Sequence, residues 1–243
     1  MTLPNVRPAD ADPALVRFGG AGAVLSGVAF VCTVAYTFGY LASLGLSVEL
    51  LDAPARLLPW IHAHTAAYMG LWGIFVLSLL LLLPAPLGLA EVAGRRRATT
   101  RVATAVGFAG IVVGLVGAMV NTATAPALGV ASQQLGAMLL PGVLLLSDLM
   151  GSLGLYLRLL SEGLIGIWLG LTGLVLLRHA GWPRLGRVQI GVAAVTLVVA
   201  LAKALYLADW EPFLGLWLAV AYLVLGVALL RARTAAPDRA PIT

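Results

Sequence analysis

Residues 90–101 read AEVAGRRRATTR and place a cluster of arginines between two long apolar segments, 61–83 and 101–122. Each segment has about the 20 residues that a helix needs to cross a ~30 Å hydrocarbon core. Arginine clusters beside such segments face the cytoplasm in membrane proteins. This stretch therefore predicts a cytoplasmic turn between two transmembrane helices.

The same pattern extends outward along the whole chain. Six apolar segments occur, at 16–42, 61–83, 101–122, 153–177, 187–207 and 212–230. The connections 43–60, 123–152 and 208–211 hold only Arg56, whereas the alternate connections and the two tails hold Arg7, Arg17, Arg95, Arg96, Arg97, Arg101, Arg178, Arg184, Arg187, Arg231, Arg233 and Arg239. The positive-inside rule then predicts an all-α bundle of six spans in the cytoplasmic membrane, with both termini inside.

Composition supports this class of protein. Hydrophobic residues make up 61% of the chain, charged residues 10%, and the mean hydropathy is +1.01, whereas charged residues make up about 25% of soluble domains. We expect one transmembrane domain at 16–231, with cytoplasmic tails at 1–15 and 232–243. The net charge of +5 does not indicate nucleic-acid binding, because the arginines lie beside helix ends, as topology signals do.

The outer connection 123–152 is long and almost uncharged, and loops of this length usually have a structure or a role of their own. From residue 142 to residue 177, one straight helix would be about 54 Å long, which exceeds a normal bilayer. The sequence therefore predicts a break near 151–154. We expect an interfacial or re-entrant helix at 137–149, within this outer connection.

Two pairs of glycines have the GxxxG spacing, Gly110 with Gly114 and Gly166 with Gly170. Small residues at this spacing let helix backbones approach closely. The pattern predicts helix packing within the bundle, and a homodimer interface is the alternative.

Three charged residues, Arg158, Glu162 and Lys203, lie within predicted spans, where each costs roughly 2.5–3.5 kcal/mol at mid-membrane. Arg158 and Glu162 are four residues apart and can pair on one helix face, which we expect near the outer end of the fourth span. They either reach the headgroups as a neutralised pair or border an outward-facing polar pocket. The candidate pocket residues are Asn121, Arg158, Glu162, Lys203, Tyr206 and Asp209.

Histidines in the second segment invite a metal or haem interpretation, which their spacing argues against. His62 and His64 project about 200° apart on a helix, so only one can face the interior. His179 lies in the opposite, cytoplasmic connection. We predict no metal site and no cofactor, and no known catalytic motif identifies a catalytic residue, so enzymatic activity is left open.

A turn after the fourth segment resembles one in a known family. The sequence reads small-aromatic-Pro-Arg-Leu-Gly at residues 181–186, Asn121 closes the third segment, and the fourth segment contains GLIGIWLGLTGLVLL at 163–177. With six arginine-flanked spans, residues 15–231 resemble a widespread family of small bacterial membrane proteins classed as a domain of unknown function. The resemblance implies the architecture and a bacterial source, and it implies no catalytic residues.

Two functional hypotheses follow. The first is a non-enzymatic accessory, packing or small-ligand-binding membrane subunit, with the lipid bilayer, other membrane subunits or a second copy of the chain as partners. The second is a transporter, channel or intramembrane enzyme that uses the polar residues around Arg158, Glu162 and Lys203. Paired broken helices in two halves, which mark many transporter sites, are not evident, and this disfavours transport.

Overall fold

The computed structural model describes residues 11–51, 53–134, 138–178, 182–205 and 211–232. These residues form helices, and no strand occurs among them. Five helical stretches are long and apolar enough to cross a membrane: Pro13–Leu41, Thr65–Ala93, Ala98–Gln134, Leu140–Leu177 and Pro183–Ala204. The all-α prediction is therefore confirmed, and the architecture fits a helical membrane bundle.

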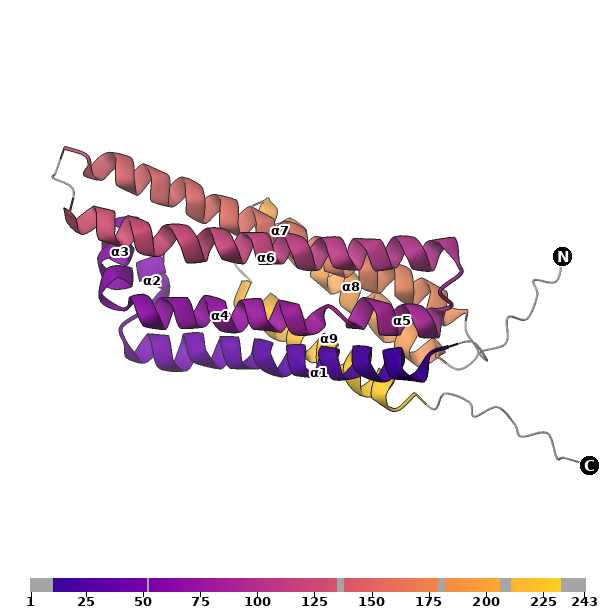
Figure 1. The fold of residues 1–243 in the computed structure, drawn as a ribbon. Coiled ribbons are helices and arrows are strands. Elements are labelled where there is room, and N and C mark those ends of the chain that lie inside the picture. The colour runs from indigo at the N-terminus through magenta and orange to yellow at the C-terminus, as the bar shows by residue number, and fades with distance from the viewer. Residues whose placement is uncertain (1–10, 52, 135–137, 179–181, 206–210, 233–243) are drawn as a thin grey trace, which may run out of the picture.

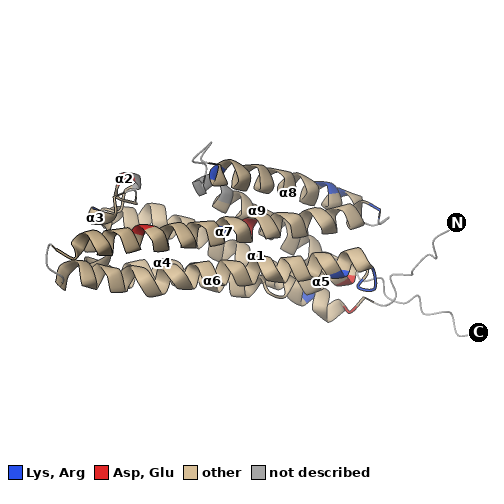
Figure 2. Cartoon of the chain, turned by 90° about the horizontal axis from the view of Figure 1, so that it is seen from above, with Lys and Arg blue, Asp and Glu red and all other residues tan. Residues whose placement is uncertain are grey.

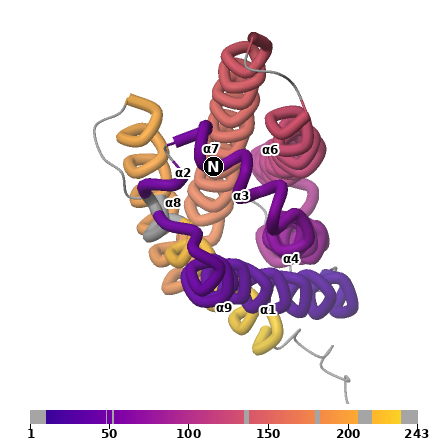
Figure 3. The backbone as a smooth tube through the Cα atoms, turned by 90° about the vertical axis from the view of Figure 1, so that its left-hand side faces the viewer, coloured from indigo at the N-terminus to yellow at the C-terminus, as the bar shows by residue number. Residues whose placement is uncertain are grey.

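The long helices run up and down the bundle, and two short helices lie at one end (Figure 1). In chain order the elements are α1 (Pro13–Ala35) with its π-helical continuation η2 (Tyr36–Leu41), α2 (Val48–Leu51), α3 (Pro54–Ala63), α4 (Thr65–Leu82), α5 (Ala85–Ala93), α6 (Ala98–Gln134), α7 (Leu140–Leu177), α8 (Pro183–Ala204) and α9 (Glu211–Leu230). Viewed along the bundle, α6, α7, α8, α9, α1 and α4 follow one another around a ring, which α9 closes against α1 (Figure 3).

Local sequence signals explain several helix ends. Asp12 caps α1 by accepting a hydrogen bond from the Ala14 amide at 2.9 Å, with Pro13 in the first turn, a position where proline loses no helical hydrogen bond. Pro84 interrupts the chain between α4 and α5. Gly94 ends α5 with φ 93°, a backbone conformation that glycine adopts without steric cost.

The predicted break near 151–154 is wrong, and so is the separate helix at 137–149. α7 is one helix of 38 residues, about 57 Å long at ~1.5 Å per residue. A break would be needed only if the helix had to end where the hydrocarbon core ends. The continuation instead has a partner, because α6 is 37 residues long and packs beside α7 as a hairpin (Figure 1).

The predicted outer connection 123–152 is therefore mostly helix. We call residues 122–134 of α6 and 140–156 of α7 the arm. Leu128 and Val143 of the arm form a small apolar cluster with Leu58 of α3. A Cβ on Gly129 would lie 3.2 Å from the Leu58 carbonyl oxygen, so α3 packs directly on the α6 backbone. These contacts give the arm an apolar core of its own, which allows both helices to continue.

Glycines set the closest helix contacts. In α1, a Cβ on Gly19 would lie 2.8 Å from the Gly88 Cα of α5, and on the other side of α1 a Cβ on Gly20 would lie 3.0 Å from the Gly226 carbonyl oxygen of α9. Gly110 and Gly114 of α6 face α7 in the same way, against Ile165 and Ser161 respectively. Close backbone approach at these points requires residues without a side chain.

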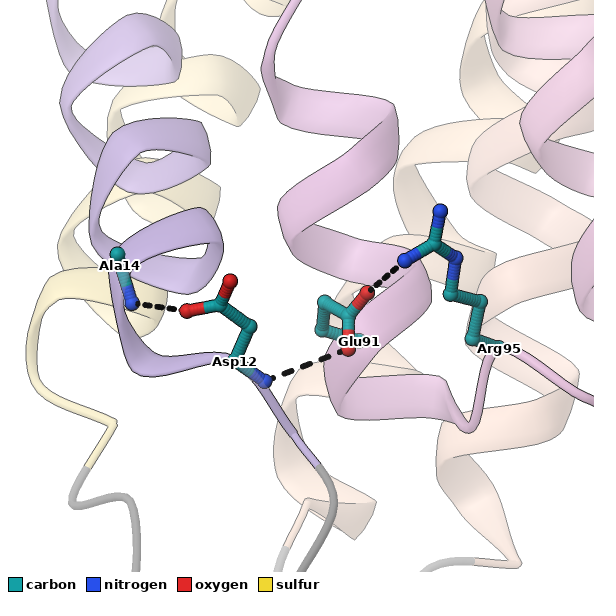
Figure 4. Close-up of polar contacts among 4 residues, drawn as sticks. All are labelled: Asp12, Ala14, Glu91 and Arg95. Carbon is teal, nitrogen blue, oxygen red and sulfur yellow. Dashed lines mark hydrogen bonds and ion pairs between the residues drawn. The ribbon is translucent and has the colours of Figure 1, made fainter.

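Most arginines gather at one end of the bundle, where α1 begins and α9 ends (Figure 2). We call this the basic end; its described arginines are Arg17, Arg95, Arg96, Arg97, Arg101, Arg178, Arg184, Arg187 and Arg231. There, Glu91 of α5 pairs with Arg95 at 3.2 Å and accepts a 3.4 Å hydrogen bond from the Asp12 backbone amide (Figure 4). This contact ties the start of α1 to the end of α5.

Candidate functional site

The charged pair predicted on the fourth span is present. The Arg158 Nε and Glu162 Oε1 atoms lie 3.8 Å apart, one helical turn from each other on α7. Glu162 is only 7% exposed, and its second carboxylate oxygen has no hydrogen-bond partner among the described residues. A carboxylate buried in this way is unusual, because burial of a charge is costly unless it is paired.

The pair lies near the middle of α7, because this helix extends beyond the predicted span 153–177. Glu162 lies about 22 Å from Leu177, the end of α7 at the basic end. The neighbouring Ser161 donates a 2.7 Å hydrogen bond to the Gly110 carbonyl of α6, and Gly110 lies about 14 Å from Arg101. The pair therefore lies at a depth where α6 and α7 pack against each other. The predicted span began at residue 153, whereas α7 begins at Leu140.

A buried tyrosine of α9 lies within electrostatic range of Glu162. Tyr222 of α9 is 1% exposed and close enough to Glu162 to interact electrostatically with its carboxylate. The signal was available in the sequence, since Tyr222 is a phenol in the middle of an otherwise apolar span. A phenol that is buried on its hydroxyl side usually serves a polar partner.

Tyr222 is also the last ring of an aromatic row that crosses the bundle from α4 through α1 to α9. Successive ring centroids are 5.5–6.4 Å apart and the rings meet edge to face, a favoured aromatic geometry. In order, the row consists of Tyr68, Trp72, Phe75, Phe30 and Tyr222.

Lys203 of α8 lies at the same depth as the ion pair. The glycines of α7 set the antiparallel register with α8: Gly166 faces Thr196, and Gly170 faces Ala193. Continuing this register for about two turns places Lys203 level with Leu159, between Arg158 and Glu162. Lys203 is partly buried, and both Lys203 and Arg158 have interactions beyond the 3.8 Å pair. The two basic residues and the one carboxylate therefore occupy one layer of the bundle.

The remaining candidates do not join this layer. Asn121 donates a 3.1 Å hydrogen bond to the Gly117 carbonyl of its own helix and packs on Gly154, where a Cβ would collide with the Asn121 amide. Its contacts are those of a residue that fits α6 against α7. Tyr206 and Asp209 lie outside the described residues.

The histidines lie away from the ion pair, in and after α3. His62 is exposed, while His64 stacks on Trp60 with ring centroids 4.9 Å apart and its Nδ1 lies 3.0 Å from the Trp60 carbonyl oxygen. Among the described residues, no group of three or more His, Cys, Asp or Glu side chains could hold a metal ion.

Fold and site together define a helical membrane protein with an acid–base pair enclosed by its helices. Comparison of the chain with family models, curated proteins and solved structures finds no match. The resemblance of residues 15–231 to a family of small bacterial membrane proteins therefore stays a prediction, and the site rests on the geometry above.

Proposed function

We propose that this protein is a non-enzymatic subunit of the cytoplasmic membrane, with six spans and both termini inside, that binds a partner membrane protein through α7. Five helical stretches long enough to cross a membrane and the shorter apolar α9, with the arginines gathered at one end, support the topology. The binding role is supported by the apolar surface that α7 leaves exposed.

One observation carries the binding role: the exposed apolar stripe of α7 is longer than the hydrocarbon core of a bilayer is thick. Its members recur every three, four or seven residues and therefore share one helix face; they are Leu145, Leu149, Leu153, Tyr156, Leu160, Ile167 and Leu174. From Leu145 to Leu174 the stripe measures about 44 Å, against a hydrocarbon core of ~30 Å. Even at a tilt of about 40°, at the limit of the usual range, it spans roughly 34 Å.

The part of the stripe that extends beyond the hydrocarbon core lies on the arm, where exposed leucines would meet headgroups or water. Large exposed apolar patches mark interaction surfaces. The GxxxG glycines do not provide an alternative surface, because Gly110 and Gly114 face α7 and Gly166 and Gly170 face α8 within the same chain. The apolar surface of a second membrane subunit would cover the leucines of the arm.

The topology has a direct test with single cysteines. In a Cys32→Ala background, Ala98→Cys at the basic end should not react with an impermeant thiol reagent on intact cells, whereas Met138→Cys, at a position that is 95% exposed at the tip of the arm, should react. Both should react once the membrane is permeabilised. If Ala98→Cys labels on intact cells and Met138→Cys does not, the proposed orientation is inverted.

The partner surface can be tested by photo-crosslinking in native membranes. A photoreactive phenylalanine analogue at Leu149 should give one protein adduct of discrete mass, and the same analogue at Val198, which is 67% exposed on α8, should give none. Adding Leu145→Asp and Leu153→Asp should reduce the adduct about tenfold or more, because an unpaired charge would enter an apolar interface.

Two results would contradict the accessory role. An adduct of twice the chain mass would make the partner a second copy of the chain. Crosslinks to lipid alone at both positions would mean that the arm lies along the membrane without a protein partner.

A second candidate function is supported by the buried layer of charges. Arg158, Glu162 and Lys203 at one depth, with Tyr222 beside the carboxylate, form the kind of intramembrane polar group that marks ion or proton pathways. This supports a transporter, channel or intramembrane enzyme as the alternative. Substitution of Glu162 distinguishes the two functions.

A further inference from the structure

An open groove of about 560 Å³ lies between α8 and α9 at the basic end. Its volume falls within the usual range of ~300–1,000 Å³ for small-molecule sites. Among the described residues, Arg184 is the one charged residue that lines it, and the others are Trp182, Pro183, Leu185 and Val188 from the start of α8, with Val224 and Ala228 from α9. The groove is thus an apolar channel with a cation at its rim.

The rim of the groove is electrostatically positive. Arg184 is exposed and forms no ion pair within the part of the chain that the structure describes. Arg187 follows Arg184 by about one turn of α8, and Arg231 follows Ala228 by about one turn at the end of α9. Over these turns the two helices have no acidic residue, so nothing in them neutralises the rim.

We propose that this groove binds an anionic phospholipid of the leaflet at the basic end. An acyl chain would lie along Leu185, Val188 and Val224, and the phosphate would accept charge-assisted hydrogen bonds from the Arg184 guanidinium. The indole of Trp182 at the mouth of the groove suits the headgroup layer. Basic pockets between transmembrane helices provide this combination for anionic lipids, whereas a free anion would gain nothing from the apolar walls.

The proposal can be tested by lipid binding to the full chain in non-ionic detergent, read by native mass spectrometry. Phosphatidylglycerol should bind with a defined stoichiometry at concentrations where phosphatidylcholine does not. Arg184→Ala should weaken phosphatidylglycerol binding about fivefold, the contribution expected of one basic residue near an anionic headgroup. Arg96→Ala, an exposed arginine of the same end but away from the groove, is the matched control and should bind as the wild type does.

A second variant tests the apolar part of the site. Val188→Trp fills the groove and should remove the bound phosphatidylglycerol, while Val198→Trp adds the same side chain to the exposed face of the same helix and should leave binding unchanged. Melting temperatures without lipid should be equal for both tryptophan variants, which separates loss of binding from loss of folding.

Three outcomes would overturn the proposal. Equal binding of phosphatidylglycerol and phosphatidylcholine would show that charge is not recognised. Equal effects of Arg184→Ala and Arg96→Ala would place the anion elsewhere. Displacement of the lipid by equimolar glycerol phosphate would show that a soluble anion suffices and that the apolar groove contributes nothing.

Discussion

Replacing Glu162 by Ala, or Arg158 by Leu, is expected to destabilise the bundle by about 3 kcal/mol, since removal of one partner breaks a largely buried ion pair. For a chain of this size the melting temperature in detergent should fall by roughly 6–12 °C. The double variant should recover part of this loss, because both members of the pair are then absent and neither has lost the other. Thermal unfolding of the purified protein, followed by tryptophan fluorescence, measures all three.

Asp148→Asn provides the matched control, because Asp148 is an exposed carboxylate on the same helix; its melting temperature should equal that of the wild type. A double variant whose loss equals the sum of the two single losses would show that Arg158 and Glu162 act independently. If none of the variants changes the melting temperature, the pair is solvated, and the observed burial of Glu162 has no energetic consequence.

Glu162→Gln separates the two candidate functions, since it keeps the shape of the side chain and removes its charge. In proteoliposomes with a trapped pH-sensitive dye, an accessory subunit should leave an imposed pH gradient as stable as empty vesicles do, for wild type and variant alike. Faster collapse with the wild type than with Glu162→Gln would favour the ion pathway and contradict the accessory role.

Substitution of closely packed glycines should also destabilise the bundle strongly. Gly19→Ala and Gly88→Ala each place a Cβ within 3.0 Å of backbone atoms of the facing helix, so the helices must separate. We expect a destabilisation of about 1–3 kcal/mol for each, the usual cost of overpacking, and a larger loss for Gly19→Val. Yield of monodisperse protein and melting temperature are the measurements.

Gly191→Ala and Gly163→Ala are the matched controls, because a Cβ at either position meets nothing within 4 Å. Both should be neutral or stabilising by up to about 1 kcal/mol, since alanine favours the helix more than glycine does. If the packed and open positions respond alike, helix propensity rather than close packing determines the role of these glycines.

Short-range features of this protein could be predicted from its sequence. Long apolar segments and clustered arginines predict membrane helices because a bilayer excludes unsatisfied backbone and charge whatever the fold. The Arg158–Glu162 pair was predictable for a similar reason, since the geometry of a single helix places residues four apart on one face.

Features that depend on a neighbour could not be predicted in this way. The length of α7 depends on α6 lying beside it and on α3 covering the arm at Leu58, Leu128 and Val143, and no pattern within α7 encodes those contacts. α7 continues without a break because a helix that has a packing partner need not end at the edge of the hydrocarbon core.

The candidate site also has features that one segment predicts and features that depend on a neighbouring helix. Sequence alone identified the charged residues, because charge is rare in apolar spans. Tertiary structure placed Tyr222 beside Glu162, and the α7–α8 register brought Lys203 to the depth of the ion pair. Those neighbours come from helices distant in sequence, and their relative positions depend on which glycines allow two backbones to approach, a property of pairs of surfaces rather than of any one segment.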